Sequence, residues 1–116
     1  MNDLATRLFN FSVKTLKLTS KLPDTPEFKV IRYQLAKSVT SCGANYEEAQ
    51  SGSTKADFAH KIRITLREMR ESNFWLRTIQ SISIELKNSD NLKDLIDESN
   101  QLRKILATIL NKMTNH

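Results

Sequence analysis

The first candidates for chemistry are an acidic residue and a histidine three positions apart, Asp57 and His60. This spacing is typical of di-iron helical bundles, which need such a pair on two helices and a glutamate on two more. The chain has two histidines, and the other is the terminal His116. On a helix, His60 also points about 160° away from Phe58, an expected core residue. We therefore predict that no metal is bound and that His60 lies at the surface.

The single cysteine, Cys42, is the candidate nucleophile. It lies on the apolar stripe of an expected helix, with no histidine near it in the sequence to serve as a base. These surroundings favour a small buried side chain instead. The sequence also contains no Gly-rich phosphate-binding loop, no G-x-S-x-G motif and no Ser-x-x-Lys motif. We predict a protein that is not an enzyme and that uses no cofactor and no small-molecule substrate.

Arginines form the third pattern. At 100° per residue from Phe58, one set of residues falls at about 100–200° and makes a basic stripe about 25 Å long. Its members are His60, Arg63, Arg67, Arg70 and Arg77. Each guanidinium can bind a phosphate through two parallel hydrogen bonds, and no exposed aromatic residues alternate with them to stack on bases. The stripe predicts binding to an RNA or DNA backbone; the alternative is a charged face that is only solvated.

The whole chain is basic, with 18 lysines and arginines against 13 acidic residues and a net charge of +5. The excess is spread along the chain and forms no basic tail. Such a surface attracts polyanions regardless of their sequence. This charge supports RNA or DNA as a partner, but it is equally compatible with a basic domain that binds neither.

A second face of the same expected helix mixes charges with large apolar side chains. At about 220–300° from Phe58 it carries Asp57, Lys61, Ile64, Glu68, Glu71 and Trp75. This mixture is unusual for a solvated face and favours a polar network against a neighbouring helix or subunit. We predict these residues to be structural or interfacial.

The preceding helix contains a segment of small residues around Gly43. A glycine inside a helix costs about 1 kcal/mol relative to alanine, and the close approach of another backbone is the usual compensation. Asn45 and Glu48 follow directly. We expect this segment to lie at a contact with another helix or with another subunit.

Helices must position all of these residues, and the sequence predicts four. Only 2 Gly and 2 Pro occur in 116 residues, too few for the turns of an all-β fold. Apolar residues repeat every three or four positions and predict helices over about residues 2–20, 26–50, 55–86 and 92–112. Short links between them predict an all-α, up-down-up-down four-helix bundle that forms a single domain over residues 1–116.

Local signals mark the helix boundaries. Pro26 suits a first helical position, with Asp24 or Thr25 as the N-cap. Thr54 followed by Asp57 resembles a capping box with aspartate in place of glutamate. In the last helix the apolar positions follow a heptad in which Ser99 occupies the skipped position.

Composition also bears on the compartment. The sequence has no apolar run of the roughly 18–20 residues that a membrane span needs, and no secretory signal is visible. One cysteine cannot form an intrachain disulfide, so nothing requires an oxidising compartment. We predict a cytoplasmic protein without a membrane partner.

Several of these motifs together resemble a known family. They are the segments 42–49 and 53–58, followed by Lys61, Ile64, Glu68, Glu71 and the segment 74–76. The pattern is similar to that of bacterial four-helix bundle proteins related to the 23S ribosomal RNA intervening-sequence proteins. The resemblance covers about residues 28–80, and Asn45, Glu48, Lys61 and Glu71 match family positions. The loop over residues 50–54 departs from the family, in which it is often more basic.

The resemblance implies an up-down bundle that assembles as a ring-like homopentamer and has no known catalytic residues. Some members are encoded inside ribosomal RNA insertions. One relative is a basic accessory protein of reverse transcriptases in diversity-generating retroelements and binds nucleic acid there. Together with the charge pattern, this predicts a homo-oligomer that binds RNA or DNA through phosphate contacts. The alternative is a protein–protein adaptor or scaffold with no direct role in nucleic-acid binding.

Overall fold

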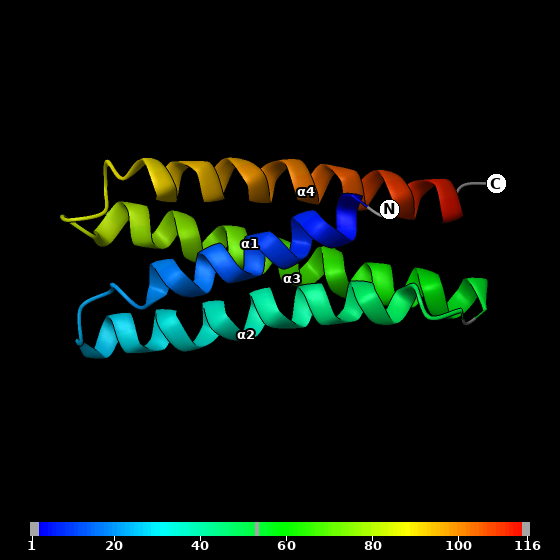
Figure 1. Cartoon of the computed structure of the whole chain (residues 1–116), viewed down its shortest axis with the longest axis horizontal. Helices are drawn as coiled ribbons and strands as arrows, with labels where there is room; N and C mark the ends of the chain where they lie inside the picture. The colour runs from blue at the N-terminus through cyan, green and yellow to red at the C-terminus, as the bar shows by residue number, and fades with distance from the viewer. Residues whose placement is uncertain (1–2, 53, 115–116) are drawn as a thin grey trace.

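The computed structural model describes residues 3–52 and 54–114, which form four helices and no strand. They are α1 (Asp3–Thr19), α2 (Pro26–Ala49), α3 (Lys55–Ile82) and α4 (Asp90–Thr114). All four run along the long axis of a body that measures 47 × 25 × 20 Å (Figure 1). Successive helices run in opposite directions, as their short links require. The predicted all-α four-helix bundle is confirmed.

Each helix packs against two neighbours, and the four surround one core. α2 packs most extensively against α3, and α1 and α4 share the smallest interface. Within the described residues, the diagonal pairs α1–α3 and α2–α4 do not approach each other closely. Side chains at the predicted apolar positions fill the centre, among them Phe11, Leu35, Ile62, Met69 and Leu102. None of the four helices, over the residues described, is long and apolar enough to cross a membrane.

The N-caps of α2 and α3 lie where the sequence places them. Thr25, rather than Asp24, caps α2, because its side-chain oxygen accepts a hydrogen bond from the backbone N–H of Phe28 at 3.3 Å. Thr54 accepts a hydrogen bond from the backbone N–H of Asp57 at 3.1 Å and caps α3. Each cap satisfies a donor that the first helical turn leaves without an intrahelical partner.

The predicted end of the third helix at residue 86 is wrong. α3 ends at Ile82, and Ser83 adopts extended backbone angles with φ −88° and ψ 118°. The hydroxyl oxygen of Ser83 accepts a hydrogen bond from the backbone N–H of Leu86 at 3.0 Å. Serine side chains compete with the helix for backbone hydrogen bonds in this way, and the chain turns here instead of continuing.

The other boundaries differ less. α4 begins at Asp90 rather than at residue 92, because Ser89 accepts a hydrogen bond from the backbone N–H of Leu92 at 3.3 Å and acts as the N-cap. It also continues to Thr114 rather than ending at residue 112. α1 and α2 each end one residue earlier than predicted, and residue 2, the predicted first residue of α1, lies outside the described residues.

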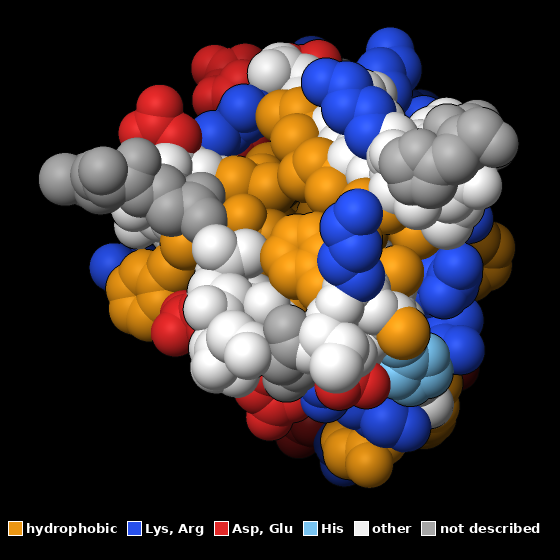
Figure 2. All heavy atoms as spheres, turned by 90° about the vertical axis from the view of Figure 1, so that its right-hand side faces the viewer, with side chains coloured by type: hydrophobic (Ala, Val, Ile, Leu, Met, Phe, Trp, Pro, Cys, Tyr) orange, Lys and Arg blue, Asp and Glu red, His pale blue; other side chains and the backbone are white. Residues whose placement is uncertain are grey.

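α1 is the shortest helix and leaves part of the core open at one end of the bundle. Its 17 residues span about 25 Å, whereas the 28 residues of α3 span about 42 Å. Hydrophobic side chains gather in the middle of the end where α2 joins α3, surrounded by polar and charged ones (Figure 2). Leu4, Phe58 and Leu110, each near a helix terminus, pack against the core while staying partly exposed.

Candidate nucleic-acid interface

The four arginines of the predicted stripe lie exposed on α3. Arg63, Arg67, Arg70 and Arg77 all point away from the face of the helix that the core buries. Within the described residues, none of the four forms an ion pair with a carboxylate. Their charge is therefore not neutralised by direct pairing, and each guanidinium keeps N–H donors that can bind a phosphate. The prediction that no exposed aromatic residue alternates with these arginines is wrong, because Phe74 lies between Arg70 and Arg77 on the same face and is 49% exposed.

A shallow depression of about 390 Å³ lies between α3 and α4. It is lined by Arg70, Asn73, Arg77, Asn100 and Arg103. The Nε of Arg77 donates a hydrogen bond to the Oδ1 of Asn73 at 2.8 Å. The Nδ2 of Asn73 donates to the Oδ1 of Asn100 at 3.2 Å, and the Nη2 of Arg103 donates to the same oxygen at 3.3 Å. A chain of side-chain hydrogen bonds thus runs from an arginine of α3 to an arginine of α4.

Asn73, Asn100 and Arg103 are candidates that the arginine stripe of α3 does not reveal. Two of them lie on α4, and their position against α3 depends on how the two helices pack. A signal is nevertheless present, because the apolar stripe of α3 is interrupted at position 73 and that of α4 at Ser99. The two interruptions face each other: the Nδ2 of Asn73, a residue only 7% exposed, donates to the Oγ of Ser99 at 2.8 Å.

The second face of α3 begins with a contact to α2. The Nζ of Lys61 lies 2.7 Å from the Oε2 of Glu48, and this ion pair joins the two helices. Asn45 turns back to its own helix, and its Nδ2 donates to the carbonyl oxygen of Ser41 at 2.8 Å. The side chain of Asp57 is exposed next to the N-cap. Of these four predicted positions, Lys61 and Glu48 are brought together across the two helices.

Glu68 lies further along the same face and is half-buried. Burial raises the pKa of its carboxyl, and the negative charge of Glu71 raises this pKa further, whereas the positive charges of Arg67 and Lys37 oppose the rise. Glu71 accepts a hydrogen bond from the indole Nε1 of Trp75 at 3.3 Å. Trp75 also packs partly against the core. Much of this face thus serves the packing of α3 within the chain.

Gly43 faces α1 without a close approach of two backbones. A Cβ atom at this position would meet the Oγ of Ser12 at 3.5 Å, which is an ordinary contact, and no other atom of a packed helix in the described chain lies within 4 Å. The hydroxyl of Ser12 instead donates a hydrogen bond to the carbonyl oxygen of Val39 at 2.8 Å. The expected backbone approach is therefore not found within the described chain.

The surroundings of Cys42 do not activate its thiol. Cys42 is buried, and its Sγ lies 3.4 Å from the carbonyl oxygen of Thr65. Burial, followed by the negative charge of Glu68, raises the pKa of the thiol to about 12, whereas a nucleophilic cysteine needs a lowered pKa. His60 is exposed, and in the part of the chain that the structure describes no group of three or more His, Cys, Asp or Glu side chains is arranged to hold a metal.

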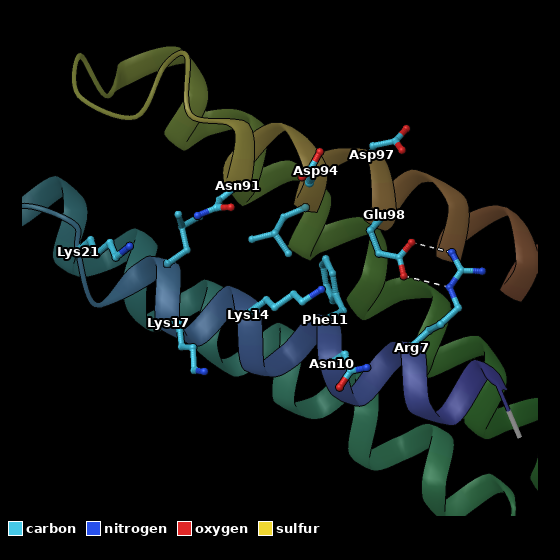
Figure 3. Close-up of a pocket in the computed structure, with 12 residues that line it drawn as sticks. Arg7, Asn10, Phe11, Lys14, Lys17, Lys21, Asn91, Asp94, Asp97 and Glu98 are labelled. Atoms are coloured by element: carbon cyan, nitrogen blue, oxygen red, sulfur yellow. Dashed lines mark hydrogen bonds and ion pairs between the residues drawn. The ribbon is translucent and has the colours of Figure 1, made fainter. Parts of the chain in front are cut away.

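A larger groove of about 680 Å³ lies between α1 and α4. Its two walls differ in charge, since Lys14 and Lys17 line it from α1 and Asp94 and Asp97 line it from α4 (Figure 3). Phe11 contributes an apolar surface between them. The groove follows from the small interface between these two helices.

Four antiparallel helices around one core, with a row of arginines on the outer face of α3, define a basic four-helix bundle protein. The chain belongs to the 23S rRNA-intervening sequence protein family, whose sequence profile matches residues 2–108. It is similar to a protein of unknown function from the S23 ribosomal protein family of Bacteroides thetaiotaomicron, whose crystal structure shares 28% sequence identity and a TM-score of 0.79. That similarity covers 92% of this chain and 97% of the other. No curated protein matches the chain.

Proposed function

We propose that this chain is a non-enzymatic, homo-oligomeric protein of the cytoplasm that binds RNA or DNA through phosphate contacts. One observation carries the proposal: Arg63, Arg67, Arg70 and Arg77 form an exposed row on α3 and, among the described residues, pair with no carboxylate. The row rises about 21 Å along the helix from its first to its last arginine. A cationic row of this length can follow several phosphates of a backbone.

Two further properties support this proposal. The net charge of +5 favours association with polyanions, and the family takes its name from insertions in 23S rRNA. Assembly into the homopentamer that the family resemblance implies would place five copies of the row on one particle. When several copies of a weak site on one particle bind the same nucleic acid, the overall affinity exceeds that of each site alone.

Charge reversal of the row tests the site. In the variant R63E/R67E/R70E/R77E we expect RNA and DNA affinity, measured by fluorescence anisotropy, to fall by about a hundredfold. The matched control K14E/K17E/K21E/K29E changes the net charge equally at four exposed lysines away from the row. We expect its affinity to fall much less, and for both proteins circular dichroism must show an intact helical fold. Equal losses in the two variants would mean that the row is not the binding site.

Native mass spectrometry before and after nuclease treatment tests the oligomeric state and the presence of bound nucleic acid. We expect a particle of five 13.3 kDa chains that loses mass when nuclease is added. A clean oligomer without nuclease-sensitive mass would favour the adaptor instead, and a monomer would contradict the assembly.

The exposed apolar side chains and the α1–α4 groove favour a second candidate function, a protein–protein adaptor or scaffold. Phe9, Val30 and Tyr33 are 59%, 56% and 66% exposed. Large apolar side chains in the open are typical of protein contact sites when they cluster. An adaptor would capture a specific protein in pull-down experiments and would lose it in the variant Phe9→Ser or Tyr33→Ser. It would bind nucleic acid only weakly, and the charge reversals of the arginine row and of the lysine control would weaken that binding equally.

A further inference from the structure

The geometry points to the depression between α3 and α4 as a seat for a phosphate group, held by Arg70, Arg77 and Arg103. We call these three residues, with Asn73 and Asn100 beneath them, the phosphate seat. The inference rests on the proposed function for the source of the phosphate, which would be a nucleic-acid backbone. The seat itself depends on the contacts between α3 and α4.

The asparagines orient the guanidinium groups. The Oδ1 of Asn73 accepts the Nε–H of Arg77 at 2.8 Å, and the Oδ1 of Asn100 accepts an Nη2–H of Arg103 at 3.3 Å. Asn73 is itself held by Ser99, since its Nδ2 donates to the serine Oγ at 2.8 Å. Because Asn73 is almost fully buried, this arrangement restrains the Arg77 side chain from below.

The donors that remain are suited to an anion. A guanidinium has five N–H groups, and the asparagines take one from Arg77 and one from Arg103, which leaves both Nη groups of Arg77 available to a ligand. The Arg77 guanidinium also lies over the ring of Phe74, with its Cζ 6.0 Å from the ring centroid, a contact that further restrains its plane. Planar, oriented guanidiniums bind phosphate oxygens in a bidentate manner.

No negative side chain competes for the seat. The five lining residues are three arginines and two asparagines, and over residues 3–52 and 54–114 none of the three arginines forms an ion pair. Three unpaired cations around one hollow repel each other, and a bound anion relieves this repulsion. The seat also extends the arginine row, because Arg103 comes from α4 and carries the basic surface across the helix boundary.

Titration with inorganic pyrophosphate tests the seat without relying on nucleic acid. By isothermal titration calorimetry at low salt, we expect wild-type protein to bind pyrophosphate saturably, with a Kd in the millimolar range or tighter. The variant R70Q/R77Q/R103Q should lose this affinity by at least about tenfold. The matched control K14Q/K17Q/K21Q removes the same charge on the α1 side, and its affinity should stay close to that of the wild type.

The variant Asn100→Ala separates an oriented seat from mere charge. It keeps all three arginines and the net charge but removes the oxygen that accepts from Arg103 and Asn73. We expect pyrophosphate affinity to fall several-fold. Unchanged affinity in Asn100→Ala, or equal affinity in the seat variant and the α1 control, would overturn the seat.

A labelled RNA duplex then identifies the source of the phosphate. If the seat holds a backbone phosphate, R70Q/R77Q/R103Q should bind the duplex more weakly than K14Q/K17Q/K21Q. The logarithm of its binding constant should also fall less steeply with the logarithm of the salt concentration, because fewer phosphates are neutralised. If pyrophosphate binds at the seat but the wild type does not bind RNA or DNA, the seat stands as a site for a small phosphate compound and the proposed function is wrong. If RNA binds equally to both variants and pyrophosphate does not distinguish them, the proposed function can stand while the seat is wrong.

Discussion

Arg7 on α1 and Glu98 on α4 form a bidentate ion pair between the first and the last helix. The Nη2 of Arg7 lies 2.6 Å from one carboxylate oxygen of Glu98, and its Nε lies 3.0 Å from the other. The hydrogen bond with Glu98 raises the pKa of Arg7. The pair crosses the smallest helix interface of the bundle and borders the α1–α4 groove (Figure 3).

We predict that the Arg7–Glu98 pair stabilises the bundle by a modest amount. The two side chains are 35% and 29% exposed, so water still screens their attraction. A double-mutant cycle with Arg7→Gln and Glu98→Gln, followed by urea unfolding, should give a coupling of about 0.5–1 kcal/mol that shrinks at high salt. A coupling free energy of zero at low salt would show that the ion pair does not stabilise the packing of α1 against α4.

Substitutions at Gly43 test whether its small size serves packing within the chain or contact with a second copy of the chain. Within the chain a methyl group fits beside Ser12, so Gly43→Ala should raise the free energy of unfolding by about 0.5–1 kcal/mol through better helix propensity. The control Ala44→Gly, at the exposed neighbouring position, should lower it by a similar amount. If Gly43→Ala instead weakens the oligomer in sedimentation experiments, a second copy of the chain occupies the space that the methyl group needs. Gly43→Leu should then disrupt assembly more strongly.

The helices and their buried faces follow from the sequence because the apolar positions of one helix depend on that helix alone. Leu8, Leu35 and Leu66 occupy predicted core positions and are buried. The end of α3 does not follow, since Ile84 and Leu86 continue the apolar pattern beyond the true end. The turn there depends on the hydroxyl of Ser83, a local hydrogen bond that periodicity does not register, and Ile84 is left 95% exposed.

The candidate site was predictable only where it lies on one helix. The exposure of Arg63 and Arg67 follows from the angle between their positions and the core stripe of α3. The approach of Arg103 to Arg77 does not, because it requires the register of α4 against α3. That register is marked in the sequence by two polar interruptions of apolar stripes, Asn73 and Ser99, which become a pair once the helices pack.

Cys42 should be unreactive in the folded protein. Burial raises the pKa of its thiol from 9.0 to about 12, so at neutral pH the thiolate is about a thousandfold scarcer than for an ordinary cysteine. With Ellman's reagent we expect the native protein to react at least about a thousandfold more slowly than the urea-unfolded chain, with Cys42→Ala as the blank. Fast labelling of the native protein would mean that α2 and α3 open far more often than a bundle core does.

Glu68 should make stability depend on pH with a definite sign. Its pKa in the folded protein is raised by burial and by Glu71, so the folded state holds the proton more tightly than the unfolded chain does. Below the ordinary carboxyl pKa of 4.5 both states are protonated, and Glu68 carries no penalty. As the pH rises through 4.5 and then through the raised pKa, the unfolded chain loses its proton first. The contribution of Glu68 to the free energy of unfolding therefore falls with rising pH and is unfavourable at neutral pH.

The variant Glu68→Gln removes that penalty. At pH 7 we expect it to be more stable than the wild type, by less than about 1 kcal/mol, because Glu68 is only half-buried and Arg67 and Lys37 lie near enough to offset part of the cost. The gain should vanish below about pH 4, where the wild-type carboxyl is protonated in both states. Glu47→Gln, at an exposed position of α2, removes the same charge and corrects for the change in net charge. If Glu68→Gln is no more stable than Glu47→Gln at pH 7, or if its gain persists in acid, the ionised Glu68 is not a source of strain in the α2–α3 packing.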